Sequence, residues 1–218
     1  MEEADADVVP ELRAYCANLN ERKDRWRQVQ REFAGSGIKL RRFPAIKNSV
    51  GWKGCGRTFQ AIVRAAKREG LPWVLIVEDD CDLRPAFFET WPRVLSALWE
   101  ERGTWDIYVS GVTNLRGIHP RLRSPLIRID HSYALQFHVV SADAYDKVLA
   151  WNPERDRQID VYYAKVMRKV TSYPSVAWQK PSLSNIENVK KDYTRSFRKS
   201  ERKLAAALRA TRKRRRAH

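Results

Sequence analysis

The most constraining feature of the sequence is a run of five apolar residues that ends in a cluster of acids. Trp73-Val74-Leu75-Ile76-Val77 is bounded by turn residues and rich in branched side chains, and Glu78-Asp79-Asp80-Cys81-Asp82 follows it directly. A continuous apolar run of this length is typical of a strand covered on both faces, as in a mostly parallel sheet. The chain is therefore expected to place four carboxylates at the carboxyl end of a buried strand.

Strands and helices alternate along the rest of the chain. Apolar periodicity and turn residues predict further strands over residues 15–19, 40–46 and 105–109 and within 126–140, and helices over 21–33, from Thr58 to Gly70, over 141–149 and from Asp160 onward. Three glycines within residues 51–56 predict a loop. The alternation favours a single α/β domain with a mixed, mostly parallel sheet flanked by helices.

The positive charge of the chain is concentrated at its end. Of the net charge of +16, residues 190–218 carry +11, from 13 Lys or Arg against two acids, which leaves +5 for the other 189 residues. The length of 218 residues suits one domain with a tail. We predict an N-terminal extension over residues 1–12, the α/β domain over 13–189, and a basic tail over 190–218 that is helical or disordered.

The N-terminal residues and the cysteines indicate the cellular compartment in which the protein is expected. Four of the first seven residues are acids and none is basic, whereas a secretory signal begins with basic residues. No apolar run is long enough to span a bilayer. Cys16, Cys55 and Cys81 are scattered and odd in number, which disfavours a disulfide framework and a paired zinc site. We expect a soluble protein of the cytoplasm, with the three cysteines as packing residues.

The acidic cluster predicts a cation site. Four carboxylates within five residues would repel one another strongly in a partly desolvated place. Mg²⁺ and Mn²⁺ take carboxylate oxygens together with substrate phosphates, and ligands of open α/β sheets bind outside the carboxyl ends of the strands. The alternative is a solvated acidic turn that caps the helix expected after Pro85.

Four blocks in order give the chain a resemblance to the family 25 glycosyltransferases. The blocks are residues 18–25 (Asn-Leu-Asn-Glu-Arg-Lys-Asp-Arg), residues 42–46 (Arg-Phe-Pro-Ala-Ile), Gly54-Cys55 with the later Val74–Asp80, and residues 136–141 with Ile159-Asp160, Gln179 and Ser184. Together they span roughly residues 13 to 187. The chain departs from the family pattern at Arg57-Thr58, where members often carry Ser-His. The resemblance implies the GT-A fold and a hexosyltransferase-like enzyme of glycan biosynthesis, as also found in large DNA viruses, whose members would act in the host cytoplasm.

The resemblance also implies the ligands and their residues. The donor would be a nucleoside-diphosphate sugar, UDP-linked by the family's default, and the acceptor a glycan or a glycoprotein. The residues implied near the nucleotide and the donor sugar are Asn18, Arg25, Ala45, Ile46, Glu78 and Asp79. The ligand of Mn²⁺ or Mg²⁺ would be Asp80 first and Asp82 second. Glu78-x-Asp80 and Asp80-x-Asp82 both have the spacing of a metal-binding motif, and Asp80 belongs to both. In an inverting transfer, Asp160 is the candidate general base.

Each of these residues also has a structural interpretation. Asn18 can close a turn, Arg25 can pair with Glu21 on a helix surface, Ala45 and Ile46 can be core residues, and Asp160 can complement a helix N-terminus. His131 and His138 are alternative bases or metal ligands, and each is equally consistent with a packed, hydrogen-bonded histidine. Trp52 and Trp178 are candidate stacking platforms for a sugar or base.

Two other classes of function remain open at the level of sequence. The basic tail suits contact with a polyanion, so the chain is alternatively a nucleic-acid-binding protein, although the body lacks a recognisable zinc-finger, RRM or KH signature. A nucleotidyltransferase would use strand-end carboxylates and a divalent ion in the same way, although the chain has no P-loop motif. A non-catalytic protein with a glycosyltransferase fold is a further alternative.

Overall fold

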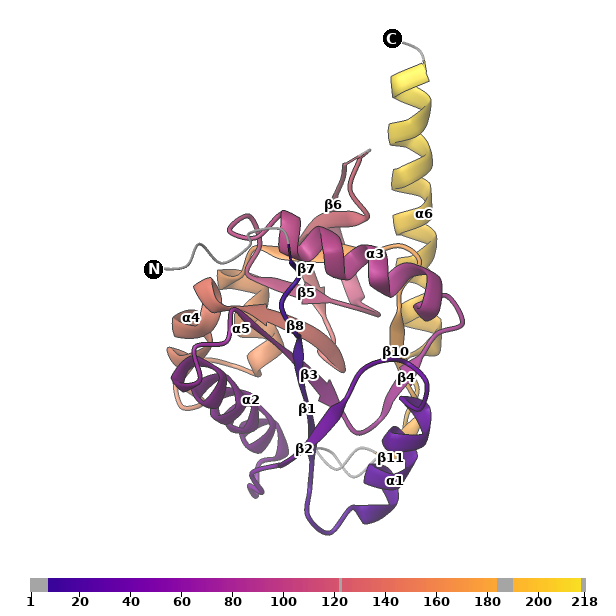
Figure 1. Cartoon of the computed structure of the whole chain (residues 1–218). Helices are drawn as coiled ribbons and strands as arrows, with labels where there is room; N and C mark the ends of the chain where they lie inside the picture. Colours follow the sequence, from indigo (N-terminus) through magenta and orange to yellow (C-terminus); the bar gives the residue numbers. More distant parts are fainter. Residues whose placement is uncertain (1–7, 122, 184–189, 217–218) are drawn as a thin grey trace.

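The computed structural model describes residues 8–121, 123–183 and 190–216 of the chain. Eight strands form one sheet in the order β2-β1-β3-β8-β5-β9-β7-β6 (Figure 1). Their bounds are β1 Arg13–Asn18, β2 Leu40–Pro44, β3 Trp73–Glu78, β5 Ile107–Val109, β6 Thr113–Pro120, β7 Leu126–Tyr133, β8 Phe137–Ser141 and β9 Lys169–Ser172. Two small sheets pair β4 Cys81–Leu83 with β10 Ala177–Gln179, and β11 Ser182–Leu183 with β12 Lys190–Lys191.

The large sheet is mixed. β1 pairs in parallel with β2 and β3, and β5 pairs in parallel with β9, whereas β8 and β7 run antiparallel to both of their neighbours. Six of the eight strands therefore point the same way. The predicted α/β class with a mostly parallel sheet is confirmed, and the stretch within 126–140 forms two strands.

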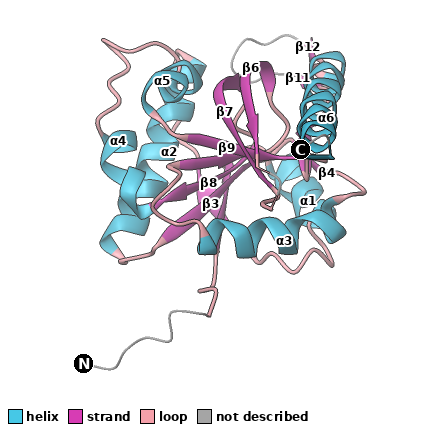
Figure 2. Cartoon of the chain, turned by 90° about the horizontal axis from the view of Figure 1, so that it is seen from above, coloured by secondary structure: helices cyan, strands magenta, loops and turns pink. Residues whose placement is uncertain are grey.

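Helices cover both faces of the sheet (Figure 2). Their bounds are α1 Lys23–Glu32, α2 Gly51–Arg68, α3 Phe87–Glu100, α4 Tyr145–Leu149, α5 Ile159–Val166 and α6 Thr194–Arg216, with a 3₁₀ turn, η1, at Ala142–Ala144. The core on one face gathers side chains of α2, α4, α5 and α6, and the core on the other face gathers those of α1 and α3. β3 contributes Val74 and Ile76 to the first core and Trp73, Leu75 and Val77 to the second, so the strand is covered on both faces as its composition predicts.

The predicted glycine loop at residues 51–56 is wrong, because these residues form the first turns of α2. The glycines allow close packing instead of a turn. A Cβ on Gly54 would lie within 3.0 Å of the carbonyl oxygen of Ile46 and 3.2 Å from the Cβ of Asn48. A Cβ on Gly56 would collide with the ring of Trp151. Two residues without side chains thus let α2 approach both the segment after β2 and the end of α4.

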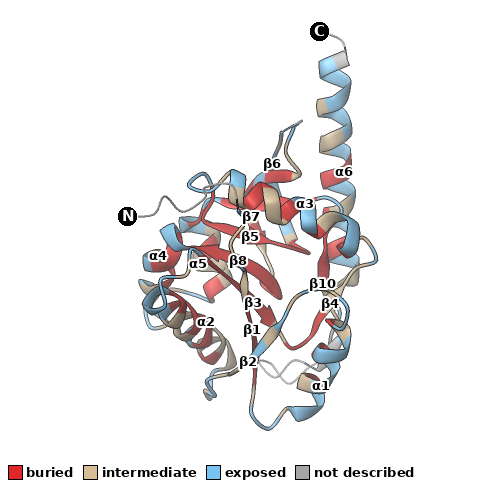
Figure 3. Cartoon of the chain, in the orientation of Figure 1, coloured by how far each residue is buried: buried red, intermediate tan, exposed pale blue. Residues whose placement is uncertain are grey.

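Near its C-terminus the chain forms a single long helix. The first half of α6 packs on the body with Phe197, Leu204 and Ala205 buried, and the second half extends away from it (Figures 1 and 3). Ser184, part of the fourth block above, lies outside the described residues. Within the part of the chain that the structure describes, no helix combines the length and apolar character needed to cross a membrane.

Candidate active site

The carboxyl ends of β1, β2 and β3 lie side by side, and the acidic cluster follows the last of them. Ala17 stands opposite Phe43 on one side and Glu78 on the other, and the backbone N–H of Ala45 donates to the carbonyl of Asn18 at 3.0 Å. The fold therefore brings Asn18 and the segment after β2 to the cluster, although 61 positions separate Asn18 from Asp79. Ligands of open α/β sheets bind at this end of the strands.

Asp79 is the anchor of a buried polar network. Its two carboxylate oxygens accept from Nδ2 of Asn18 at 2.7 Å and from Nη1 of Arg25 at 2.8 Å. Asn18 also donates to the carbonyl of Arg22 at 3.1 Å, so it closes a turn as well as facing the cluster. The surface interpretation of Arg25 is wrong, since this side chain is buried and reaches Asp79 from α1.

Asp80 and Asp82 have different surroundings. Asp80 accepts from Nε2 of Gln179 at 2.9 Å, and its backbone carbonyl accepts from the N–H of Lys180 at 2.8 Å. Asp82 accepts from Arg84 at 3.0 Å and lies 3.7 Å from the ammonium of Lys180. Within the described part of the chain, Asp80 thus has one cation nearby, Arg25 at 3.8 Å, whereas Asp82 lies between two, Arg84 and Lys180.

Two adjoining cavities open at this end of the sheet. The smaller, of about 200 Å³, is lined by residues of α1, the segment after β2, the start of α2 and the acidic cluster: Arg25, Ala45, Ile46, Lys47, Asn48, Asp79 and Asp80 among them. The larger, of about 340 Å³, is lined by Trp52, Asn114, Tyr133, Ala134, Asp160 and Tyr193 among others. Cys55, Phe59, Glu78 and Gln179 line both. Asp82 is absent from both linings.

The interpretation of Ala45 and Ile46 as core residues is also wrong. Ile46 is 40% exposed, and both residues form part of the wall of the smaller cavity. The hydroxyl of Thr58 on α2 accepts from the N–H of Ile46 at 2.8 Å and donates to the carbonyl of Gly54 at 2.7 Å. These two bonds hold the segment after β2 against α2, and with it the cavity wall.

Two carboxyl groups face the larger cavity, and both have raised pKa values. Burial raises the pKa of Glu78 well above its usual value, and the negative charges of Asp80, Asp79 and Asp160 raise it further. Burial also raises the pKa of Asp160, against the opposing effects of the Val161 N–H at 2.8 Å and of the buried ammonium of Lys169. The two groups come from opposite sides of the site, Glu78 from β3 and Asp160 from the first turn of α5.

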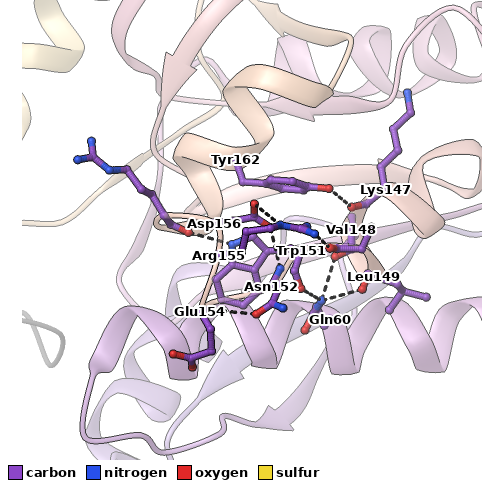
Figure 4. Close-up of polar contacts among 12 residues, drawn as sticks. Gln60, Lys147, Val148, Leu149, Trp151, Asn152, Glu154, Arg155, Asp156 and Tyr162 are labelled. Carbon is purple, nitrogen blue, oxygen red and sulfur yellow. Dashed lines mark hydrogen bonds and ion pairs between the residues drawn. The ribbon is translucent and has the colours of Figure 1, made fainter.

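The connection between α4 and α5 positions Asp160. Nε2 of Gln60 on α2 donates to three backbone carbonyls at the end of α4, those of Val148, Leu149 and Trp151, at 3.1, 3.1 and 2.8 Å (Figure 4). The hydroxyl of Tyr162 donates to the carbonyl of Lys147 at 3.1 Å. These bonds join α4 and α5 to the helix that forms the other wall of the cavity.

Of the candidate histidines and tryptophans, only Trp52 lines a cavity. His138 is buried against Phe59, its Nδ1 lies 2.6 Å from the carbonyl of Leu135, and burial lowers its pKa to about 4. It lines neither cavity, so the packed-residue interpretation fits it, and the same holds for His131, which packs against Tyr133. Trp52 lines the larger cavity, whereas Trp178 packs against Phe197 and the guanidinium of Arg84.

Sequence reasoning assigned no role to several residues of the larger cavity. Gln179 stood in the fourth block, but its bond to Asp80 spans 99 positions and leaves no local signal. Tyr193 lies within the predicted tail of residues 190–218, yet it lines the cavity. Asn114 and Ala134 have φ values of 49° and 82° and both line the cavity. Non-glycine residues in this conformation are uncommon and gather at functional sites, yet no sequence pattern reveals them.

The acidic residues are compatible with a divalent cation that a substrate helps to bind. Among the described residues, no three His, Cys, Asp or Glu side chains converge on one point. Mg²⁺ is usually bound through one or two carboxylates plus substrate phosphates, so a three-residue cluster is not required. Asp80, which lines the smaller cavity, fits this arrangement. Burial, and after it the negative charges of Asp80, Asp79 and Asp160, raises the pKa of Glu78 beside it.

The fold and the position of the site define a GT-A, Rossmann-like domain. The chain superimposes on a solved glycosyltransferase involved in glycosylation of the major capsid of PBCV-1, with a TM-score of 0.53 and 13% identity, over 82% of this chain and 97% of that one. It superimposes on A197 from STIV with a TM-score of 0.50 and 9% identity, over 83% and 93%. No protein-family model and no curated protein matches the sequence, so membership of family 25 is not confirmed.

Proposed function

We propose that the chain is a glycosyltransferase that transfers a sugar from a nucleoside-diphosphate sugar, UDP-linked, to a hydroxyl of a glycan or glycoprotein. The observation that carries this proposal is the pair of adjoining cavities at the strand ends. One is lined by Asp79 and Arg25, with the buried Asn18 bonded to Asp79 behind them, and the other is lined by Asp160; Glu78 lines both. A two-part site of this kind suits a donor and an acceptor that meet at Glu78.

The smaller cavity is the proposed nucleotide subsite. Ala45 and Ile46 offer a small and an apolar surface to the base and ribose, and the guanidinium of Arg25 contributes positive charge beside the phosphates. Asn18 and Arg25 fix the carboxylate of Asp79, so Asp79 presents an oriented acceptor to hydroxyls of the ribose or the donor sugar. Glu78, which lines both cavities, faces the same hydroxyls.

Asp80 is the proposed ligand of Mn²⁺ or Mg²⁺, and Asp82 joins it only if it leaves Arg84 and Lys180. A bound divalent ion supplies positive charge to the departing nucleoside diphosphate. The amide of Gln179 holds one oxygen of Asp80 in place. This bond ties the orientation of the ligand to β10.

Asp160 is the proposed general base on the acceptor side. Its raised pKa brings the carboxylate closer to the basicity needed to remove a proton from a hydroxyl near neutral pH. The acceptor oxygen forms its bond to the anomeric carbon while the bond from that carbon to the diphosphate breaks, and the hydroxyl proton passes to Asp160. Attack from the side opposite the leaving group gives inversion. Tyr133 and Trp52 on the cavity wall exclude water and offer flat surfaces to a sugar ring.

A panel of nucleoside diphosphates and their sugars tests ligand binding through the thermal unfolding midpoint. Ligands that bind the folded state raise the midpoint by mass action. We expect stabilisation by UDP that depends on Mn²⁺ and is lost in Asp80→Ala. No response to any nucleotide, with or without metal, would contradict the proposal.

Product analysis then separates glycosyl transfer from nucleotidyl transfer, since the first releases nucleoside diphosphate and the second pyrophosphate. We expect Asp160→Asn to lose transfer by about 10²–10⁴-fold while its stabilisation by UDP is unchanged. Asp143→Asn, which removes an exposed carboxylate on η1, is the matched control and keeps full activity. Equal activities of the two variants would exclude Asp160 as the base.

A further inference from the structure

Helix α6 has two halves with different surroundings. Over its 23 residues it extends about 34 Å at 1.5 Å per residue. The first half is fixed to the body: Glu201 accepts from the N–H of Ser175 at 3.0 Å, and Nζ of Lys203 donates to the carbonyl of Leu115 at 3.0 Å. From Arg209 to Arg215 the residues are exposed apart from a half-buried Thr211, and the helix stands clear of the body (Figure 3).

The extended half is positively charged on all of its sides. It carries Arg209, Arg212, Lys213, Arg214 and Arg215, and the sole acidic residue of α6, Glu201, belongs to the first half. Successive residues on a helix point about 100° apart, so the four consecutive cations at 212–215 surround the axis. No ion pair among the described residues involves these four.

The first half continues the same charge along one side of the helix. Arg195, Arg198, Lys199 and Arg202 are exposed and recur at spacings of three and four, which places them on one face, opposite the buried Phe197 and Leu204. Helix α6 is thus a basic helix that is fixed to the body at its N-terminal end only. Such a concentration of positive charge favours binding of a polyanion.

The distribution of cations around α6 favours a partner with a groove over a partner with a flat surface such as a bilayer. A helix that binds a bilayer lies in the interface with an apolar face buried, whereas the only apolar side chain after Leu208 in α6 is that of Ala210. A flat surface can also contact only one side of a helix, whereas the cations of the extended half surround the helix axis. The major groove of double-helical DNA is about 12 Å wide, admits an α-helix and has phosphates along both rims.

We propose that the extended half of α6 binds the phosphate backbone of double-helical nucleic acid, through charge and without base-sequence preference. The proposal is independent of the proposed glycosyl transfer, because it uses residues 209–215, none of which lines either cavity. Five cations in contact with phosphates predict a slope of about −4.5 for log K against log salt concentration.

The test measures binding of the full chain to a fluorescent DNA duplex of mixed sequence at several salt concentrations. We expect affinity to fall at least about 500-fold between about 50 and 200 mM salt, and only about 12-fold for the variant Arg212→Ala/Lys213→Ala/Arg214→Ala/Arg215→Ala, which keeps Arg209 and Arg216. The unfolding midpoint of this variant should equal that of the wild type, because the replaced side chains are exposed.

The matched control removes four exposed cations from the body, as Lys39→Ala/Arg64→Ala/Arg68→Ala/Arg93→Ala. It should retain the steep salt dependence. An equally steep dependence in the α6 variant would overturn the proposal. So would tighter binding of the wild type to phosphatidylserine-containing vesicles than to the duplex at the same salt and the same concentration of anionic groups.

Discussion

Gly54→Ala tests whether close packing is the reason for glycine at the start of α2. An alanine Cβ would lie within 3.0 Å of the carbonyl oxygen of Ile46 and 3.2 Å from the Cβ of Asn48. Because the first neighbour is backbone and the Thr58 hydroxyl holds that segment, either the segment or α2 must shift. Overpacking costs about 1–3 kcal/mol, and alanine in a helix gains about 1 kcal/mol over glycine.

Because backbone atoms cannot move aside as easily as a side chain, we expect the overpacking cost to be about 2–3 kcal/mol. After the gain of about 1 kcal/mol in helix propensity, the free energy of unfolding falls by about 1–2 kcal/mol. For a chain of this size that lowers the unfolding midpoint by about 2–8 °C. The displaced residues Ile46 and Asn48 line the smaller cavity, so stabilisation by UDP should also fall. Gly56→Ala, whose Cβ meets Trp151 instead, should lose stability without the same loss of response to UDP.

The control measures helix propensity in α2 without a steric effect. Arg64 is exposed on this helix, and the variants Arg64→Ala and Arg64→Gly should differ by about 1 kcal/mol in favour of alanine. Calorimetry or chemical denaturation of the four variants completes the comparison. If Gly54→Ala were more stable than the wild type by the difference seen at position 64, the close-packing argument would be refuted.

Two further predictions concern buried charges. Asp79→Ala removes the ion pair at 2.8 Å from the buried guanidinium of Arg25, which keeps Asp80 at 3.8 Å, so the free energy of unfolding should fall by about 1.5–3 kcal/mol in urea titrations. A loss below about 1 kcal/mol would contradict a desolvated ion pair. Burial lowers the pKa of Lys169 to about 8, so between pH 8 and about 10.4 the unfolded chain retains a proton that the folded chain releases. The stability of the wild type relative to Lys169→Met should therefore rise across this range, by up to about 3 kcal/mol, and a difference that is flat with pH would contradict the depressed pKa.

The sequence predicts what depends on local pattern. The apolar run at residues 73–77 specifies a strand covered on both faces, and the acids after it necessarily lie at the strand end. The same local logic fails for Gly54 and Gly56. Glycine permits a turn and equally permits close approach, and the neighbours that decide lie outside the glycine segment: Ile46 and Asn48 for Gly54, and the distant Trp151 for Gly56.

The site itself depends on long-range pairing that periodicity does not encode. Asp80 is oriented by Gln179 because β4 pairs with β10, and no spacing within either segment predicts that pairing. Ile46 was equally ambiguous. An apolar residue at a strand end is usual in a core and usual in a ligand-binding wall, and only the position of α2 distinguishes the two.

The pairing of β4 with β10 also sets an order of events during synthesis. The residues that hold Asp79, Asn18 and Arg25, precede it in the chain, whereas Gln179, which holds Asp80, is 99 positions later. At about 5–20 residues per second the ribosome needs roughly 5–20 s to add that stretch. A nascent chain can therefore form the nucleotide side of the site well before it can fix Asp80, and the site is completed only when β10 and Tyr193 have been made.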